Sequence, residues 1–370
     1  MDAFYASVEL LRYPELRGQA VVVGGSTAPP ERLADGTHRF ARLRSYVGRG
    51  VVTTSSYEAR ALGVFSAMGL MKAAQLAPDA VLLPADFKAY RHYSNVFKAA
   101  VASIAPHIEN RGVDEIYIDL TALDEDTRPL ASRIKAAVRA ATGLSCSIGV
   151  APNKLLAKIA SELDKPDGLT VLAPHDVARR VWPLPVRKIN GIGPKASERL
   201  NALGIESVAD LAHAPPDLLQ THFGLHYAQW LLQAAHGHDD RKVERHSEPK
   251  SISRETTFDR DLHARHDRRE LGDIFTSLCA LLAADLDRMG YAGRTVGIKL
   301  RYSDFQIVTR DISLPEPVMD NAAIRRAAAE CIRRAPLDKR LRLMGVRVSA
   351  LTPAADVAAA VAPRQGKLFD

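Results

Sequence analysis

The sequence is poor in cysteine and contains no long apolar run. Its 370 residues include three cysteines, Cys146, Cys279 and Cys331, which lie far apart and match no metal-ligand spacing. We expect small buried thiols in a reducing compartment, which argues against a disulfide scaffold and against a zinc site. No apolar run approaches the roughly 20 residues of a membrane span, and no signal-peptide pattern is present. We therefore expect a cytoplasmic monomer without membrane contacts.

The composition is that of a basic globular protein. Hydrophobic residues make up 46% of the chain and charged residues 25%, and the length allows about two to four domains. The net charge is +7 and the sequence pI about 9.3. A basic surface favours polyanionic partners, because contacts with phosphates release condensed counterions. Charge alone does not separate a nucleic-acid-binding protein from other basic proteins.

The pattern of apolar residues predicts an α+β fold. In the first part we expect a strand over 20–25, a long loop without periodicity over 26–50, a strand from 51 and a helix around 57–62. Further on we expect helices over 88–105, 129–142 and 152–163 and strands over 113–120 and 145–150. Prolines between 174 and 185 mark a domain boundary, which is followed by helices over 186–240 and a charged linker over 241–245.

The last part of the chain predicts a second α+β unit. The expected order is a strand over 251–258, a helix over 268–289, strands over 294–302 and 305–314, a helix over 320–335 and a strand over 341–349. This β-α-β-β-α-β order is that of the split, ferredoxin-like arrangement. Lys299, Arg301 and Arg310 lie on its strands, so a basic sheet surface is plausible.

The sharpest chemical signal is the pair of adjacent carboxylates Asp114 and Glu115. Phosphoryl transfer with two metal ions needs carboxylates that bridge divalent cations about 3.5–4 Å apart. Pleating of the predicted strand would send the two side chains to opposite faces. Both reach one site only if the strand start is bent, which a turn at Arg111 and Gly112 could supply. Taken alone, the segment is more simply an exposed, charged strand end.

Three other side chains could bind a polyphosphate. Tyr57 and Arg60 lie one helical turn apart, and a guanidinium can hold phosphate oxygens through paired N–H donors. Lys165, fixed before a proline, could point its charge at a phosphate. Each of these residues, taken singly, is more simply an ordinary surface side chain.

Two glycines, Gly191 and Gly193, lie between helical patterns, with Lys195 close behind them. Backbone N–H groups of such a turn can face a DNA phosphate and position a duplex without reading its sequence. A plain glycine turn is the alternative.

Together these segments resemble the Y-family translesion DNA polymerases, in particular their bacterial members. The matching stretches are residues 1–9, 57–68, 112–121, 147–168, 189–200 and 250–258, in family order. The resemblance implies an α+β right-hand polymerase. Its expected parts are a ferredoxin-like palm without its first strand (1–16 and 87–175), fingers (17–86), a helical thumb with a helix-hairpin-helix (176–245), a β-α-β-β-α-β little finger (246–352) and a flexible tail (353–370).

The resemblance also implies roles for individual residues. Asp114 is expected to bind metal, Glu115 to be the catalytic carboxylate that also binds metal, and the backbone carbonyl of Met1 to be a further ligand of two Mg²⁺ ions. The expected nucleotide-binding residues are Phe4, Tyr5, Tyr57, Arg60 and Lys165. Tyr5 is expected to be a steric gate whose ring occupies the space of a ribose 2′-OH. The expected DNA-binding residues are Gly191, Gly193, Lys195, Lys299 and Arg301.

The chain departs from the family pattern in two places. Family members begin with a β-strand that ends in an aspartate just before the position of Met1, and Asp2 matches only the following acidic position. Either the start codon was assigned too late, which we favour because the downstream motifs are intact, or the protein is an impaired polymerase. The second departure is the longer segment 26–50, with five arginines.

The tail carries Gln365 followed by Leu368 and Phe369, which resembles the short peptide that binds the sliding clamp, the beta subunit of DNA polymerase III. A glutamine supplies hydrogen bonds, the Leu-Phe pair fills an apolar pocket, and tethering raises the local DNA concentration.

The expected function is low-fidelity translesion synthesis on primer-template DNA from deoxynucleoside triphosphates, without proofreading, in DNA repair and damage tolerance. One alternative is a DNA-binding protein with impaired catalysis, because the first metal-binding aspartate is absent. A weaker alternative is a nucleotidyl cyclase, since such enzymes also place paired carboxylates on α+β palms.

Overall fold

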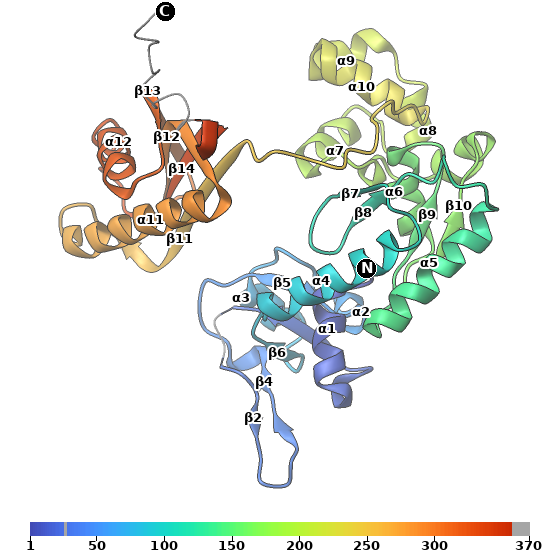
Figure 1. Ribbon diagram of the computed structural model, residues 1–370, viewed down its shortest axis with the longest axis horizontal. Coiled ribbons are helices and arrows are strands. Elements are labelled where there is room, and N and C mark those ends of the chain that lie inside the picture. The colour runs from blue at the N-terminus through green and yellow to red at the C-terminus, as the bar shows by residue number, and fades with distance from the viewer. Residues whose placement is uncertain (26–27, 357–370) are drawn as a thin grey trace, which may run out of the picture. The chain divides into compact units, whose positions relative to one another are not determined.

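The computed structural model describes residues 1–25 and 28–356 (Figure 1). The chain divides into two compact units, Met1–His246 and Ser247–Asp370. Each cluster of buried apolar side chains lies within one of these units, so each unit is stabilised by a core of its own. Among the described residues, no helix is long and apolar enough to cross a membrane.

A four-stranded sheet in the order β4-β6-β1-β5 organises the N-terminal part of the first unit. The strand β1 (Val21–Gly24) pairs antiparallel with β5 (Val52–Ser55) and parallel with β6 (Val81–Leu83), and β4 (Ala41–Arg42) pairs with β6. The helices of this part are α1 (Phe4–Arg12), η1 (Pro14–Leu16), α2 (Tyr57–Ala61) and α3 (Leu70–Leu76). All four residues of β1 are buried, which confirms the buried strand predicted here.

The long loop predicted over 26–50 is wrong for much of its described part. Here β2 (Glu31–Arg32) and β3 (His38–Arg39) form a hairpin, which is followed by β4 and the 3₁₀ turn η2 (Leu43–Ser45) (Figure 1). The carboxylate of Asp35 accepts a hydrogen bond from the backbone N–H of Thr37 at 2.9 Å and shapes the tip. Strands of two residues give no periodic pattern, so the sequence did not reveal them.

Two separate strand pairs follow. The antiparallel pair is β7 (Ile108–Asn110) with β8 (Ile116–Ile118), and the parallel pair is β9 (Ile148–Val150) with β10 (Leu169–Val171). The helices around them are α4 (Phe87–Ala102), α5 (Thr127–Thr142) and α6 (Lys154–Leu163). The three predicted helices are confirmed within a few residues, whereas β10 was not predicted.

The rest of the first unit is helical, as predicted. Short turns η3 (Pro174–Asp176), η4 (Val177–Val181) and η5 (Val186–Lys188) precede α7 (Pro194–Asn201), α8 (Val208–Ala212), α9 (Pro216–Phe223) and α10 (Leu225–Ala235). Their apolar faces share a core with α6, in which Leu155 and Ile159 are buried with Leu200 and Leu231.

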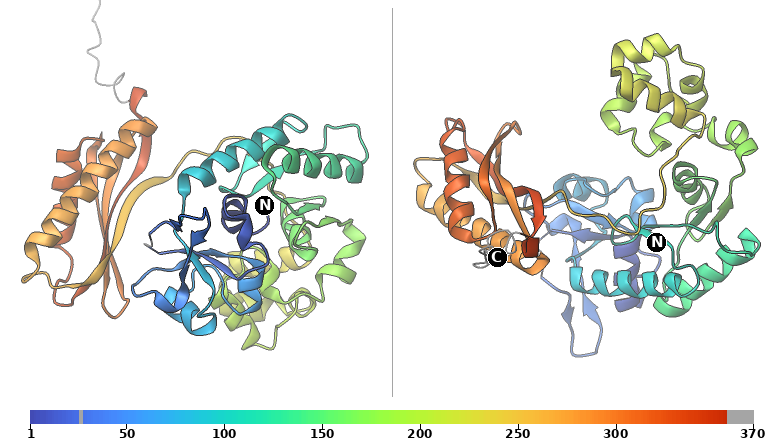
Figure 2. Two further views of the ribbon diagram at one scale, coloured as in Figure 1. Left: turned by 90° about the horizontal axis from the view of Figure 1, so that it is seen from below. Right: turned by 45° about the horizontal axis from the view of Figure 1, so that its top comes forward.

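The second unit has the predicted element order. It consists of β11 (Ser251–Leu262), α11 (Arg268–Met289), β12 (Tyr291–Tyr302), β13 (Ile307–Val318), α12 (Asn321–Arg333) and β14 (Leu341–Pro353). The strands form one antiparallel sheet in the order β11-β14-β12-β13, and both helices pack on one face (Figure 2). Alternate residues of β12, such as Val296, Ile298 and Leu300, are buried under the helices. The residues between them lie on the open face.

Candidate active site

The carboxylates Asp114 and Glu115 lie in the turn between β7 and β8. The backbone N–H of Arg111 donates to the carbonyl of Glu115 at 3.0 Å and closes this turn, and β8 begins only at Ile116. The predicted strand over 113–120 is therefore wrong at its start. Since the two acids precede the strand, its pleat does not force their side chains apart. Adjacent carboxylates in such a turn can approach the same cation.

The start of the chain lies against this turn. The Met1 amine donates a hydrogen bond to the backbone carbonyl of Asp114 at 2.8 Å. Burial lowers the pKa of this amine against the opposing charge of Asp114, and the positive charge of Lys165 adds to the decrease. Asp114 and Lys165, which lie in separate segments of the chain, therefore both act electrostatically on Met1.

The helix α1 presents Tyr5 to the same region. Its ring stacks on Tyr90 of α4 with centroids 4.2 Å apart, and the ring of Phe87 lies nearly perpendicular to it with centroids 6.1 Å apart. Burial raises the pKa of Tyr5, and the charge of Asp114 raises it further. The neighbouring Phe4 is buried among core residues, so its backbone rather than its ring is left to contact a ligand.

The helix α2 carries Tyr57 and Arg60 on one face. The guanidinium of Arg60 lies 5.0 Å from the centroid of the Tyr57 ring, and its Nε donates to the carbonyl of Ser55 at 3.2 Å. Burial raises the pKa of the Tyr57 phenol, with a further increase from the charge of Asp2. The Tyr57 hydroxyl is a buried group without a hydrogen-bond partner among the described residues. Such a group is satisfied when a polar ligand reaches it.

A row of alternating charges joins Glu115 to Lys165. Lys158 Nζ lies 2.6 Å from Glu115 Oε2 and 3.4 Å from Glu162 Oε1. The same Glu162 oxygen lies 2.7 Å from Lys165 Nζ. Desolvation opposes ionisation of Glu162, but Lys165 and Lys158 outweigh it and lower its pKa. The carboxylate expected to be catalytic and the lysine expected to bind triphosphate therefore belong to one connected network.

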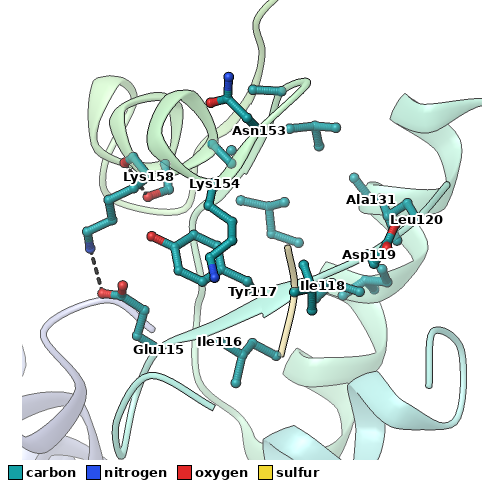
Figure 3. Close-up of a pocket in the computed structure, with 18 of the residues that line it drawn as sticks. Glu115, Ile116, Tyr117, Ile118, Asp119, Leu120, Ala131, Asn153, Lys154 and Lys158 are labelled. Atoms are coloured by element: carbon teal, nitrogen blue, oxygen red, sulfur yellow. Dashed lines mark hydrogen bonds and ion pairs between the residues drawn. The ribbon is translucent and has the colours of Figure 1, made fainter. Parts of the chain in front are cut away.

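A cavity of about 820 Å³ lies between β8 and β9. Glu115 and Lys158 meet at one side of it, and Tyr117 lies against Lys154 within it (Figure 3). Its walls also include Ile116, Ile118 and Ile148, which are only half-buried. This space separates the two strand pairs, and among the described strands β8 pairs with β7 and β9 with β10. Met1 and Asp114 also line the cavity.

The acidic residues suit a hard divalent cation in part. Mg²⁺ is commonly held by one or two carboxylates together with oxygens of substrate phosphates, and Asp114 and Glu115 supply such a pair. Residues 1–25 and 28–356 contain no cluster of three acidic, histidine or cysteine side chains that could hold a metal. The carboxylate of Asp2 is used in local structure, since it accepts hydrogen bonds from Ser147 Oγ at 2.7 Å and from the backbone N–H of Asp167 at 2.9 Å.

Sequence reasoning missed the contribution of Lys158, Glu162 and Tyr90. Lys158 and Glu162 stand four residues apart on the polar face of α6, a spacing typical of a helical ion pair. That pattern indicates their contact with each other. It does not reveal the contact of Lys158 with Glu115, which lies 43 positions before it in the chain.

The glycine turn before α7 has a structural reason of its own. Gly191 has φ of +118°, and a Cβ atom there would lie 2.6 Å from the ring of Trp230. The Tyr227 hydroxyl donates to the Gly191 carbonyl at 3.0 Å. Gly193 is the N-cap of α7 and Lys195 is exposed. The turn therefore requires glycine at 191 whether or not DNA binds, and its role in DNA binding stays a prediction.

Of the predicted basic residues of the second unit, Lys299 and Arg301 lie on the open face of its sheet. The prediction is wrong for Arg310, which lies opposite Ile298 on the face covered by the helices and donates from its Nε to the Arg334 carbonyl at 3.2 Å. Lys299 forms an ion pair with Glu255 at 2.8 Å. Arg301 is partly buried, and its Nε has no hydrogen-bond partner among the described residues. The clamp-binding residues Gln365, Leu368 and Phe369 lie outside the described residues.

Comparisons with known proteins cover nearly the whole chain. The model of the impB/mucB/samB family matches residues 1–162, that of the family's C-terminal domain residues 249–361, and that of the IMS family HHH motif residues 174–205. A protein named DNA polymerase IV from Alkalilimnicola ehrlichii is 39% identical over 355 residues, which cover 95% of this chain and 93% of that protein. One of the same name from Methanoculleus marisnigri is 40% identical, covering 95% and 92%. A solved Y-family DNA polymerase chimera has 28% identity and a TM-score of 0.77, covering 94% of this chain and 96% of that one.

Proposed function

Because the chain belongs to the impB/mucB/samB family of Y-family DNA polymerases, its reaction is DNA-directed DNA synthesis, and we propose that it performs low-fidelity translesion synthesis with two Mg²⁺ ions. The observation that carries this proposal is the convergence of Asp114, Glu115 and Lys165 around the start of the chain. Such a polymerase adds a deoxynucleoside monophosphate to a primer 3′-OH, releases pyrophosphate and does not proofread.

We assign the chain's own residues to three roles, which are to hold the metal ions, to bind the triphosphate and to exclude a ribose. Asp114 and Glu115 would hold the metal ions, with the Met1 carbonyl as a further ligand, and such ions would offset charge that develops on the phosphate oxygens. Tyr57, Arg60 and Lys165 bind and orient the triphosphate. The Tyr57 hydroxyl, which has no partner within residues 1–25 and 28–356, can donate a hydrogen bond to a phosphate oxygen.

The Tyr5 ring excludes a ribose 2′-OH, and the backbone N–H of Phe4 faces phosphate. Tyr5 suits this role because Tyr90 and Phe87 hold its ring in place. A gate works only if its ring cannot move aside when the wrong sugar enters.

Primer extension tests the proposal. The protein, and a form extended at its N-terminus by a β-strand that ends in an aspartate, are given primer-template DNA, Mg²⁺ and deoxynucleoside triphosphates. We expect Mg²⁺-dependent incorporation that the Asp114→Ala and Glu115→Gln variants lose while their affinity for primer-template DNA is retained. Failure of both forms to incorporate nucleotide would contradict synthesis.

A second candidate is a DNA-binding protein with impaired catalysis. It is favoured by the palm geometry, in which β8 and β9 are not hydrogen-bonded and Asp114 and Glu115 lack a third acidic partner among the described residues. This candidate predicts salt-sensitive DNA binding by both forms and no extension by either, so the same experiment separates the two.

We further propose that the tail binds the sliding clamp through Gln365, Leu368 and Phe369. A partner protein that encircles DNA would keep a monomeric polymerase near its template without new contacts at the active site. Titration of the purified clamp against the protein and against the Leu368→Ala, Phe369→Ala double variant tests this. Equal binding by both proteins contradicts it.

A further inference from the structure

The polar face of α6 places one carboxylate between two lysines that are assigned to different tasks. Glu162 Oε1 lies 2.7 Å from Lys165 Nζ and 3.4 Å from Lys158 Nζ. Lys158 in turn lies 2.6 Å from Glu115. One oxygen of Glu162 therefore serves both lysines, in the same way as an oxygen of a bound phosphate would.

From this arrangement we propose that Glu162 is a positioning residue that holds Lys165 in place until the triphosphate of an incoming nucleotide replaces it. The inference rests on the proposed role of Lys165 in nucleotide binding. On binding, a phosphate oxygen takes over the hydrogen bond that Glu162 accepts from Lys165. Glu162 then keeps Lys158 as its partner, and no bond is made or broken beyond this exchange of hydrogen bonds.

The exposure of the row allows such an exchange. The side chains of Lys158, Glu162 and Lys165 are 20%, 39% and 25% exposed, so the pairs are partly solvated. Partly exposed ion pairs are weak, whereas hydrogen bonds between an ammonium and a phosphate are charge-assisted and short. A triphosphate carries more charge than one carboxylate and can therefore displace it.

The charges of these four side chains also favour re-formation of the Glu162–Lys165 ion pair after the nucleotide leaves. Four groups of alternating sign, from Glu115 to Lys165, leave the row neutral before the nucleotide arrives. Without Glu162, Lys165 would lose the ion pair that the described part of the chain gives it, and its charge would face that of Lys158, which repels it. Glu162 thus preorganises Lys165 but competes with the nucleotide for it.

Lys165 is reached by other charges as well. The Met1 amine is within its electrostatic range, and Asp167 follows two residues later. Asp167 is bound by Lys135 and Arg139, at 2.9 and 2.7 Å. Among the described residues, Glu162 is therefore the carboxylate that is paired with Lys165.

The test measures nucleotide binding directly, so it does not depend on synthesis. Isothermal titration calorimetry of the full chain with dATP and Ca²⁺ compares wild type with Glu162→Gln, Lys165→Gln and the double variant. We expect Glu162→Gln to bind dATP about two- to fivefold more tightly, the range of an exposed ion pair. Lys165→Gln binds more weakly, and adding Glu162→Gln to it changes nothing further. Glu58→Gln removes the charge of an exposed side chain on α2 and is the matched control, with unchanged affinity.

Inorganic tripolyphosphate in place of dATP isolates the phosphate contribution and is expected to show the same order of affinities. In primer extension, Glu162→Gln is expected to lower KM for the nucleotide with little change in kcat, and Glu162→Asp to restore KM. If Glu162→Gln leaves dATP binding unchanged or weakens it, while Lys165→Gln still weakens dATP binding, the proposal for Glu162 is overturned and the assigned role of Lys165 stands. Unchanged binding by Lys165→Gln overturns both this proposal and the assigned role of Lys165.

Discussion

Lys299 of β12 reaches over Gly345 of β14 to Glu255 of β11, with its Nζ 2.8 Å from Oε2. The register places Gly345 directly opposite both partners. A Cβ atom at Gly345 would lie 2.8 Å from the Cβ of Glu255, so a side chain there would crowd the carboxylate. Glycine in the middle strand therefore lets the ion pair lie flat across the sheet.

A second ion pair on the same face also crosses a glycine in the strand between its partners. Arg347 of β14 pairs with Asp311 of β13 at 2.8 Å, and Gly297 of β12 lies between them. Lys299 and Arg347 lie on the face expected to bind DNA, and the charge of each is thus partly neutralised by a carboxylate of the same sheet.

Removing one of these carboxylates is expected to strengthen DNA binding. In the Glu255→Gln variant, Lys299 is free to contact a phosphate, so affinity for primer-template DNA should rise about two- to fivefold. The slope of log affinity against log salt should steepen by about 0.9 if one phosphate contact is gained. Fluorescence anisotropy at several salt concentrations measures both quantities.

Asp287→Asn is the control, because Asp287 is an exposed acid on helix α11 of the same unit. It removes the same charge away from the sheet face. Equal effects of Asp287→Asn and Glu255→Gln would show that only net charge matters and would contradict a specific contact of Lys299.

Two glycine-to-alanine substitutions are expected to differ in cost. At Gly297 the added Cβ would lie 1.9 Å from Asp311 Oδ1, the end of a side chain that can turn away. At Gly149 of β9 it would lie 2.2 Å from the Ala157 carbonyl and the Ser161 amide, which belong to the backbone of α6. Gly149→Ala should therefore lower the free energy of unfolding by about 1–3 kcal/mol, and Gly297→Ala by clearly less. Urea denaturation of both variants measures the two losses in the free energy of unfolding. A larger loss for Gly297→Ala than for Gly149→Ala would contradict this prediction.

The sequence predicted the second unit better than the first, for a physical reason. The helix over 268–289 is long, its apolar stripe repeats at helical spacing, and the strand after it alternates, so local patterns suffice. In the first unit, β2 and β3 have two residues each, and ring contacts between His38 and Tyr13, 5.1 Å apart, support them across the chain. Contacts of that kind leave no periodic signal.

The candidate site shows the same limit. Motifs located Asp114, Glu115, Tyr57, Arg60 and Lys165 as separate segments, and the family resemblance gave them roles. The partners that hold these residues in place could not be read from spacing. Glu115 meets Lys158 only because the β7–β8 turn and α6 come together in the fold.

The ion pair between Arg254 and Asp285 makes the second unit sensitive to acid. Hydrogen bonds from Arg254 and then Arg288 lower the pKa of Asp285 from 3.8 to about 2. Because the folded-state pKa lies below the ordinary value, the stabilisation is complete above about pH 4 and is lost as the pH falls toward 2. The difference in stability between wild type and Asp285→Asn should therefore be constant near neutrality and shrink over that interval.

Tryptophan fluorescence would report on the first unit, which contains both Trp182 and Trp230. Hydrogen exchange of peptides from residues 251–262 measures the difference in stability within the second unit instead. Asp273→Asn, which removes an exposed charge from the same helix α11, is the control. A gap between wild type and Asp285→Asn that persists undiminished at pH 2 would contradict a role for the Asp285 charge.

The stacking of Tyr5 on Tyr90 leads to a prediction about sugar discrimination. If the Tyr5 ring fills the space of a 2′-OH, then Tyr5→Ala should reduce the preference for dATP over ATP by about tenfold or more, whereas Tyr5→Phe keeps the ring and the preference. Tyr90→Leu removes the face on which Tyr5 stacks at 4.2 Å, so it should loosen the ring and lower the preference by less than Tyr5→Ala. Calorimetric titration with dATP and with ATP in the presence of Ca²⁺ gives the ratio of affinities without requiring synthesis. A ratio that is the same for wild type and Tyr5→Ala would remove Tyr5 from the nucleotide site, because a side chain that contacts the sugar cannot be deleted without changing which sugar fits.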